Sequence, residues 1–418
     1  MLAVTRAGRQ APAGRSDMIG QPLTARCFAI AVVTAQVLVQ IGAYALPALL
    51  PGVMDRWALS ATEAGWLMGG FFAAYVAAVP VLVALTDRMA PRRIYLIGAG
   101  ATALSHFGFA LLAEGFWSGL VWRALAGIGW AGCYMPGLKV LADRLEGAAQ
   151  SRAVSWHAAG VGIAGASSFA VAGAMDALAG PEAAFLFGGV AASIAFLIGA
   201  LVMPGTAPAP AAVPGALLDF RPVFRNRAAM AWIAGYTVHT WELAALRAWG
   251  VTFLVAAFAW QPTPAWMPGA SAIFTAIGLF GIFVSVAGNE TAQRRGRGRV
   301  VAAAMGGGAA LCLLTGASIL VSAPLAVLCV LAWNTAIYLD SAALTAGTVQ
   351  AAEKARRGAT MGLHSMCGYA GGFIGPIGVG LALDLAGRES ALGWLLAFGH
   401  LAPITLLGWW ALRRLSRA

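Results

Sequence analysis

The sequence contains few charged residues. Only 10% of its 418 residues are Asp, Glu, Lys or Arg, whereas 60% are hydrophobic, and the mean hydropathy is +0.78. A water-soluble domain carries about a quarter charged residues. The chain therefore has too little polar surface to cover a soluble protein of this length, and its composition favours a membrane protein.

The chain also lacks the motifs of an enzyme or a metalloprotein. It has no phosphate-binding loop and no nucleophile motif, and its cysteines do not have metal-ligand spacing. The sequence predicts no cofactor and no metal site, and no segment is long enough for a nucleotide-binding domain. The five cysteines, all in or beside apolar runs, are Cys27, Cys133, Cys312, Cys329 and Cys367.

Long apolar runs are abundant. A membrane-spanning helix needs about 20 apolar residues, whereas a spanning β-strand is short and alternates apolar with polar residues. The long runs are apolar on all sides and predict an all-α membrane protein with twelve transmembrane helices. The runs are residues 28–50, 62–85, 93–113, 117–142, 152–175, 183–203, 229–257, 267–288, 300–321, 324–348, 358–385 and 391–412.

The basic residues collect on one side of this predicted topology. Of the 27 Lys and Arg, only Arg56 and Arg388 fall in outer loops, and only Arg123 and Arg247 lie well inside apolar runs. Loops rich in Lys and Arg stay in the cytoplasm, so both termini are predicted to be cytoplasmic. The net charge of +11 is thus a signal of topology and does not indicate a nucleic-acid partner.

Residues 204–228 interrupt the apolar pattern with PGTAPAPAAVPG, which is too rich in proline to hold a helix. The segment LTDRMAPRR in the first half is echoed by GNETAQRRGRGR in the second, and repeated halves are typical of secondary transporters. The predicted organisation is a disordered basic tail at 1–25, an N-terminal six-helix bundle at 26–203, a cytoplasmic linker at 204–228 and a C-terminal six-helix bundle at 229–414.

From about residue 26 to 414, the chain resembles the major facilitator superfamily. Asp87-Arg88 and Arg92-Arg93 match the inner-loop signature of that family, although Val83 and Ala90 replace its glycines. The resemblance implies two pseudo-symmetric bundles that alternate in access. Further matches are Arg123, Gly127, Gly129 and Gly132 in the fourth run, and the stretch GYAGGFIGPIGVG in the eleventh.

The inner-loop signature also implies a gate. Asp87 would accept charge-assisted hydrogen bonds from nearby arginines and hold the halves together on the inner side, with Arg88 as its neighbour. The alternative is that these charges only anchor the topology. Anchoring is the interpretation favoured for Arg92 and Arg93.

Four charges lie at membrane depth: Arg123, Glu242, Arg247 and Asp340. Each costs at least about 2.5–3.5 kcal/mol to insert, so each requires a reason. Helical spacing groups Arg123 with Trp130 and Tyr134, and groups Arg247 with Tyr236 and His239. The resemblance implies that the first, fourth, seventh and tenth helices line a central cavity. We therefore expect these faces to line it, together with Gln36, Gln40 and Tyr44 from the first helix and a polar stripe containing Asn334 and Tyr338 on the tenth.

Arg123 and Arg247 are candidates to bind an anionic substrate, since guanidinium remains charged and presents several donors. Internal pairing, for example of Arg247 with Glu242 or Asp340, is the alternative. Glu242 is the leading candidate proton carrier, with His239 one turn away and Asp340 as a further candidate, and a permanently paired structural carboxylate is the alternative.

The contexts of His157 and His364, near the starts of the fifth and eleventh runs, resemble equivalent positions of the two halves, and a capping or packing role is the favoured interpretation for both. The sequence thus predicts a monomeric, proton-coupled carrier of a small organic or inorganic anion in a bacterial-type inner membrane. Proton-driven efflux of amphipathic or cationic compounds is an alternative, and a non-transporting membrane sensor or scaffold is another. The predicted partners are the substrate, protons and the lipid bilayer.

Overall fold

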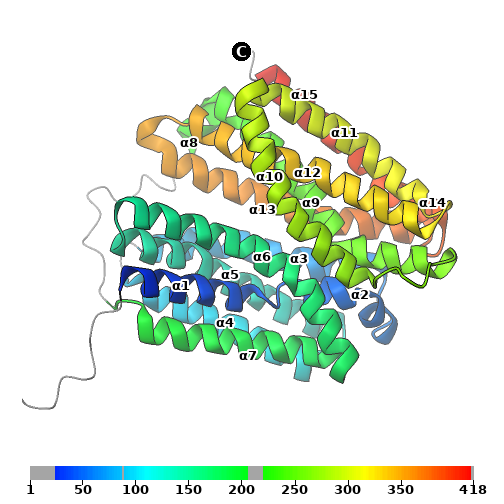
Figure 1. Ribbon diagram of the computed structural model, residues 1–418, viewed down its shortest axis with the longest axis horizontal. Helices are drawn as coiled ribbons and strands as arrows, with labels where there is room; N and C mark the ends of the chain where they lie inside the picture. The colour runs from blue at the N-terminus through cyan, green and yellow to red at the C-terminus, as the bar shows by residue number, and fades with distance from the viewer. Residues whose placement is uncertain (1–23, 87–88, 206–219, 416–418) are drawn as a thin grey trace, which may run out of the picture.

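A computed structural model describes residues 24–86, 89–205 and 220–415, and in these residues every regular element is a helix. The helices form two bundles, which Figure 1 shows as a blue-to-green N-terminal half and a green-to-red C-terminal half. The N-terminal half comprises α1 (Ala25–Gln40), α2 (Ala45–Arg56), α3 (Ala61–Leu85), α4 (Pro91–Leu112), α5 (Phe116–Arg144), α6 (Gly147–Ala179) and α7 (Pro181–Val202).

A short helix, α8 (Arg221–Arg225), precedes the C-terminal half. That half comprises α9 (Arg227–Trp260), α10 (Ala270–Arg295), α11 (Arg297–Ser318), α12 (Ala323–Ala351), the 3₁₀ turn η1 (Lys354–Arg356), α13 (Arg357–Ala386), α14 (Ala391–Gly399) and α15 (Leu401–Leu415). The predicted tail, most of the predicted linker, and Asp87 and Arg88 lie outside the described residues.

The prediction of an all-helical membrane protein is confirmed. Within the described residues, eleven helical segments are long and apolar enough to cross a membrane, and α5 is the twelfth long helix. Arg123, Lys139, Asp143 and Arg144 reduce the hydropathy of α5. Most helices extend beyond the predicted apolar runs because their polar ends continue the helix past the hydrocarbon.

The first predicted run is two helices in the structure. The chain turns at residues 41–44, and Tyr44 N–H donates to the hydroxyl of Ser168 on α6, 2.9 Å away. Gly42 faces the ring of His106 and the backbone of Gly188, where an added Cβ would lie 2.4 Å from His106 Nε2. Close contacts with other helices therefore stabilise the break, and Gly42 and Pro47 in the first run also disfavour a continuous helix.

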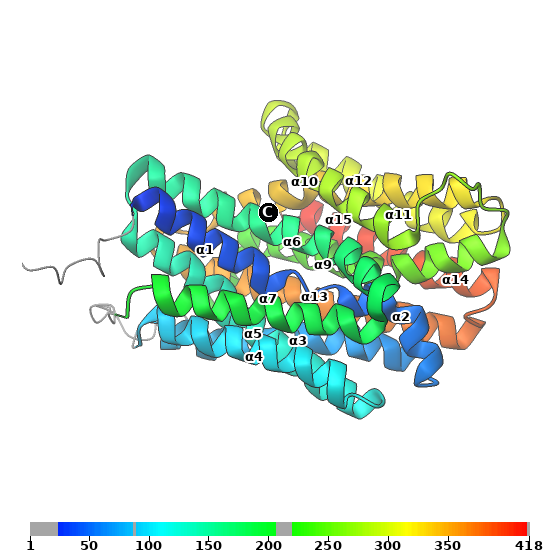
Figure 2. The same ribbon diagram turned by 60° about the horizontal axis from the view of Figure 1, so that its bottom comes forward.

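The helices begin and end at two opposite ends of the molecule. We call the end where α1 begins and α15 ends the termini end, and the opposite end the far end. Figure 1 shows the two halves converging toward the far end, on the right of the view. Figure 2 shows α1, α6 and α7 side by side along the N-terminal half, in agreement with their mutual contacts.

The halves pack together through α3 against α13, α6 against α10, and α2 against α9. Glycines allow the closest approach. A Cβ added to Gly65 would lie 2.6 Å from the carbonyl oxygen of Pro376, and one added to Gly380 would lie 2.2 Å from that of Ala61. Both contacts belong to the far-end half of α3 and α13, so the described molecule is closed there.

Candidate functional site

Arg247 on α9 joins the two halves near the middle of the molecule. Its Nη1 donates to the hydroxyl of Tyr44 in the N-terminal half, 2.8 Å away, and its Nη2 donates to the hydroxyl of Tyr338 on α12. Its guanidinium carbon lies 5.3 Å and 5.7 Å from the centres of the same two rings. Among the described residues, Arg247 forms no ion pair with a carboxylate, so its charge is met by phenol groups alone.

Arg123 on α5 is the second buried cation, with 6% of its surface exposed. Its Nε donates to the carbonyl oxygen of Leu67 at 3.3 Å, and its guanidinium lies 4.9 Å from the centre of the Phe71 ring. A small cavity of about 10 Å³ is lined by both Arg123 and Tyr44. The two arginines therefore approach the same tyrosine from different halves, and Arg123 too lacks a carboxylate partner among the described residues.

Tyrosines gather around this centre. Tyr75 on α3 and Tyr369 on α13 have ring centres 4.1 Å apart across the boundary between the halves. The electrostatic neighbours of Tyr369 include Tyr44, Tyr134 and Tyr236. Tyr75 and Tyr369 were not among the predicted site residues, because only the first, fourth, seventh and tenth helices were expected to line the cavity. Their position in the middle of apolar runs, in a chain with only seven tyrosines, is a signal that would have found them.

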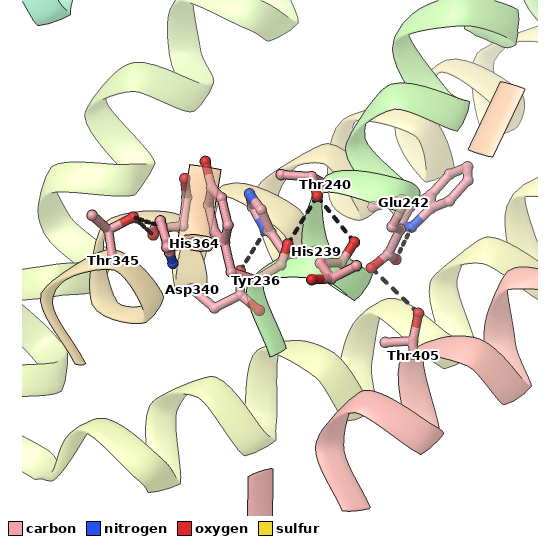
Figure 3. A network of polar contacts seen from close by, with 11 residues as sticks. Tyr236, His239, Thr240, Glu242, Asp340, Thr345, His364 and Thr405 are labelled. Atoms are coloured by element: carbon pink, nitrogen blue, oxygen red, sulfur yellow. Dashed lines mark hydrogen bonds and ion pairs between the residues drawn. The ribbon is translucent and has the colours of Figure 1, made fainter. Parts of the chain in front are cut away.

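Glu242 is buried inside the C-terminal half. Trp333 Nε1 donates to its Oε1, and the hydroxyl of Thr405 lies 3.4 Å from its Oε2 (Figure 3). Its Oε1 would also lie 2.9 Å from a Cβ added to Gly308. The carboxylate thus lies among α9, α11, α12 and α15 and does not contact Arg247.

His239 and Asp340 form a second buried polar group in the same half, with His239 Nδ1 2.8 Å from Asp340 Oδ1. The neighbouring ring of Tyr236 is stacked on His364, with ring centres 3.8 Å apart, and lies 5.7 Å from His239. His364 is also within 3.1 Å of the Thr348 hydroxyl. Figure 3 shows these side chains in a row beside Glu242.

The remaining predicted site residues lie in different surroundings. Asn334 donates from Nδ2 to the carbonyl oxygen of Ile277, 3.1 Å away, and so joins α12 to α10. Gln36 and Gln40 are buried in the N-terminal half, and their amide groups have no hydrogen-bond partner among the described residues. Trp130 packs against Phe71, and Tyr134 lies 5.5 Å from His157.

A separate cavity of about 770 Å³ lies at the termini end, between the starts of α1 and α6. Arg26, Arg152 and Trp156 contribute to its lining, with alanines and branched aliphatic residues between them. It shares no lining residue with the centre at Arg247.

The arrangement has the features of a binding site and lacks those of a metal centre. The structure brings Arg123, Arg247, Tyr44 and Tyr338 together, and it places Glu242 and the His239–Asp340 pair in the adjoining bundle. Among the described residues, no group of three or more His, Cys, Asp or Glu could hold a metal ion. The centre therefore combines aromatic faces with two arginines that have no carboxylate partner among the described residues.

Comparison with known proteins agrees with this architecture. The model of the Major Facilitator Superfamily matches residues 32–376, and the chain belongs to that family. No curated protein matches the sequence. The resemblance to this family, the absence of an enzymatic role and the membrane-transport class are therefore confirmed.

Three solved structures illustrate the similarity. A bacterial homologue of the human lysosomal transporter Spinster, inward-facing and occupied, aligns with a TM-score of 0.78 and 15% identity over 95% of this chain and 98% of that one. The nucleoside transporter NupG aligns with a TM-score of 0.75 and 14% identity over 94% and 99% of the two chains. The human organic anion transporter MFSD10 aligns with a TM-score of 0.67 and 20% identity over 94% of this chain and 100% of that one. At these identities the likeness establishes the fold alone.

Proposed function

We propose that this transporter carries a small organic anion by proton-coupled alternating access. The observation that carries the proposal is Arg247, whose guanidinium is contacted by tyrosines of both halves and is not neutralised by any described carboxylate. An unpaired cation within a membrane protein is costly, and a bound anion would offset that cost. The aromatic lining favours an organic anion over an inorganic one, because ring faces and edges bury apolar surface.

The position of the two buried acids supports an anion over a cation. Glu242 is hydrogen-bonded inside the C-terminal half, and Asp340 faces His239. Neither carboxylate contacts the centre formed by the arginines and tyrosines. Efflux of cationic compounds would use these acids as binding groups, and their present contacts do not favour that alternative.

Proton coupling would come from the C-terminal half. The ring of Tyr236 lies 5.7 Å from that of His239, and Tyr236 also interacts electrostatically with Arg247. A proton gained by this pair or by Glu242 would make the surroundings of the centre more positive and strengthen anion binding. Release of the proton would weaken anion binding, so the movement of protons would be coupled to the movement of the anion.

The proposed setting is a bacterial-type inner membrane with both termini in the cytoplasm and the protein as a monomer. The basic residues support this orientation. At the far end, Arg56 and Arg388 are each paired with an acidic residue. The described residues at the termini end include Arg92, Arg93, Arg294 and Arg295. Such asymmetry is typical of the cytoplasmic side.

A thermal-shift experiment on the purified protein tests the anion proposal. We expect benzoate or succinate to raise the Tm and tetraphenylphosphonium to leave it unchanged, because a ligand stabilises only the state to which it binds. Arg247→Lys should abolish the shift, because lysine lacks the planar fork of donors. The matched control, Arg388→Lys, changes an exposed arginine at the far end and should keep the shift.

Stabilisation by tetraphenylphosphonium and by no carboxylate would overturn the anion proposal in favour of cation efflux. Coupling is tested in weakly buffered proteoliposomes with the carboxylate that gives the largest shift. Carboxylate uptake should change the internal pH, and uptake without such a change would refute proton coupling. Binding without any flux would instead favour a sensor or scaffold.

A further inference from the structure

At the far end, a carboxylate of the C-terminal half caps a helix of the N-terminal half. Asp384, in the last turn of α13, accepts the N–H of Ala61 at Oδ1 and the N–H of Thr62 at Oδ2, each at 2.8 Å. Ala61 is the first residue of α3, so these amides have no partner within their own helix. The positive end of the helix dipole also favours a carboxylate at this place.

The start of α3 is capped a second time, from within its own half. Glu63 Oε2 accepts hydrogen bonds from the N–H and the hydroxyl of Ser60, both at 2.9 Å. The Ser60 hydroxyl in turn accepts the N–H of Glu63 at 3.1 Å, so the helix has a local N-terminal cap that does not depend on α13. The contribution of Asp384 is a connection between the two halves.

The surroundings of Asp384 show that the halves meet closely at this point. Gly380, one turn earlier on α13, lies against the backbone of Ala61. A few residues later, Arg388 Nη2 lies 3.6 Å from Asp55 Oδ1 of the N-terminal half, although both side chains are exposed. Asp384 thus belongs to a group of contacts that all cross the boundary between the halves at the far end.

We propose that Asp384 is a latch that holds the far end closed and sets the balance between the two open states of the transporter. The inference rests on the proposed alternating access. When the far end opens, the two amides and the carboxylate separate. Because Asp384 is exposed, water can then solvate these groups, and the latch is reversible. Asp384 does not contact the substrate in this proposal and acts only by holding α13 against α3.

Double electron–electron resonance tests this proposal without a substrate or a proton gradient. Spin labels at Glu114→Cys and Val321→Cys, in a background without the native cysteines, report the far-end distance between the halves, since both residues lie in far-end connections. Asp384→Asn should raise the ratio of far-end-open to far-end-closed molecules by about tenfold, because hydrogen bonds to a charged group are stronger than neutral ones.

The matched control is Glu63→Gln, which removes a negative charge at the same helix start but breaks no contact between the halves. We expect the control to leave the distance distribution unchanged, and Asp384→Glu to restore much of the closed population. An equal shift in both variants, or an unchanged distribution in Asp384→Asn with only a lower Tm, would overturn the latch. Either result would leave the anion proposal intact, because that proposal is tested by ligand-induced stabilisation.

Discussion

In the C-terminal half, His239 lies 2.8 Å from Asp340, and His364 contacts a threonine hydroxyl and the ring of Tyr236. In the N-terminal half, His157 is the histidine that the sequence predicts to be equivalent to His364, but neither of its ring nitrogens has a hydrogen-bond partner among the described residues. The two halves share a fold, but these histidines have different surroundings in each half.

The acids follow the same division. Glu242 and Asp340 are the buried carboxylates of the described residues, and both belong to the C-terminal half. The N-terminal half contributes Arg123, which donates a hydrogen bond to a carbonyl oxygen and lies over an aromatic ring. We infer that the halves have specialised, with proton exchange in the C-terminal half and part of the anion site in the N-terminal half.

The largest expected effect comes from Glu242→Gln. Glutamine can still accept the hydrogen bond from Trp333 but cannot carry a proton, so proton-driven accumulation should be lost while substrate exchange continues. Uptake and counterflow in proteoliposomes measure the two activities, and Glu353→Gln, at an exposed acid of the same half, is the control. Retention of both activities would remove Glu242 as the carrier.

A large loss of stability should follow from His239→Leu. This substitution leaves Asp340 buried without its partner, and breaking a buried pair costs about 3–5 kcal/mol. The double variant His239→Leu/Asp340→Leu should recover most of that loss, because no buried charge remains. Denaturant titration in detergent measures the free energy of unfolding. A double variant as unstable as the single one would show that the two side chains are not energetically coupled.

A moderate effect should distinguish the two tyrosines that contact Arg247. Tyr44→Phe removes a hydrogen bond between the halves, whereas Tyr338→Phe removes one within the C-terminal half. A single hydrogen bond contributes about 0.5–1.5 kcal/mol, so Tyr44→Phe should shift the open-state ratio by roughly two- to tenfold. The far-end spin labels measure this ratio, and an equal shift from Tyr338→Phe would argue against a role in joining the halves.

The smallest effect on stability is expected for Gln36→Leu. Its amide is buried without a described partner, so an apolar replacement should change the free energy of unfolding by less than about 1 kcal/mol. Asn334→Leu is the contrasting variant, because it breaks a hydrogen bond to Ile277 and should destabilise the protein. Unchanged stability with reduced transport in Gln36→Leu would support the predicted role of Gln36 in substrate binding.

Much of the fold was accessible from the sequence. The predicted apolar runs correspond to the spanning helices, and the motif around Arg123 indicated the family that the comparison confirmed. The turn at residues 41–44 was missed because the apolar pattern continues through it and its main contacts lie on other helices, at Ser168 and His106. An apolar run contains no information about contacts with other helices.

The candidate site was predicted less completely. Helical spacing identified Arg247 and Tyr338 as residues of inward faces, and the structure places them in contact. The same spacing grouped Asn334 with Tyr338, and both reach α10, where Asn334 donates to Ile277 and the Tyr338 ring packs against Gly281. Tyr338 also contacts Arg247 of α9. One face of a helix covers a wide arc, so residues on the same face can contact different neighbouring helices.

Hydrophobicity and the distribution of arginines determined, from the sequence alone, that this chain is a bundle of membrane helices, because both depend on the transfer of side chains from water to lipid. The pairing of His239 with Asp340, the position of Arg247 between two tyrosines and the contact of Asp384 with α3 were decided only by the tertiary structure. These contacts depend on how helices approach one another, and that approach is set by packing along their whole length.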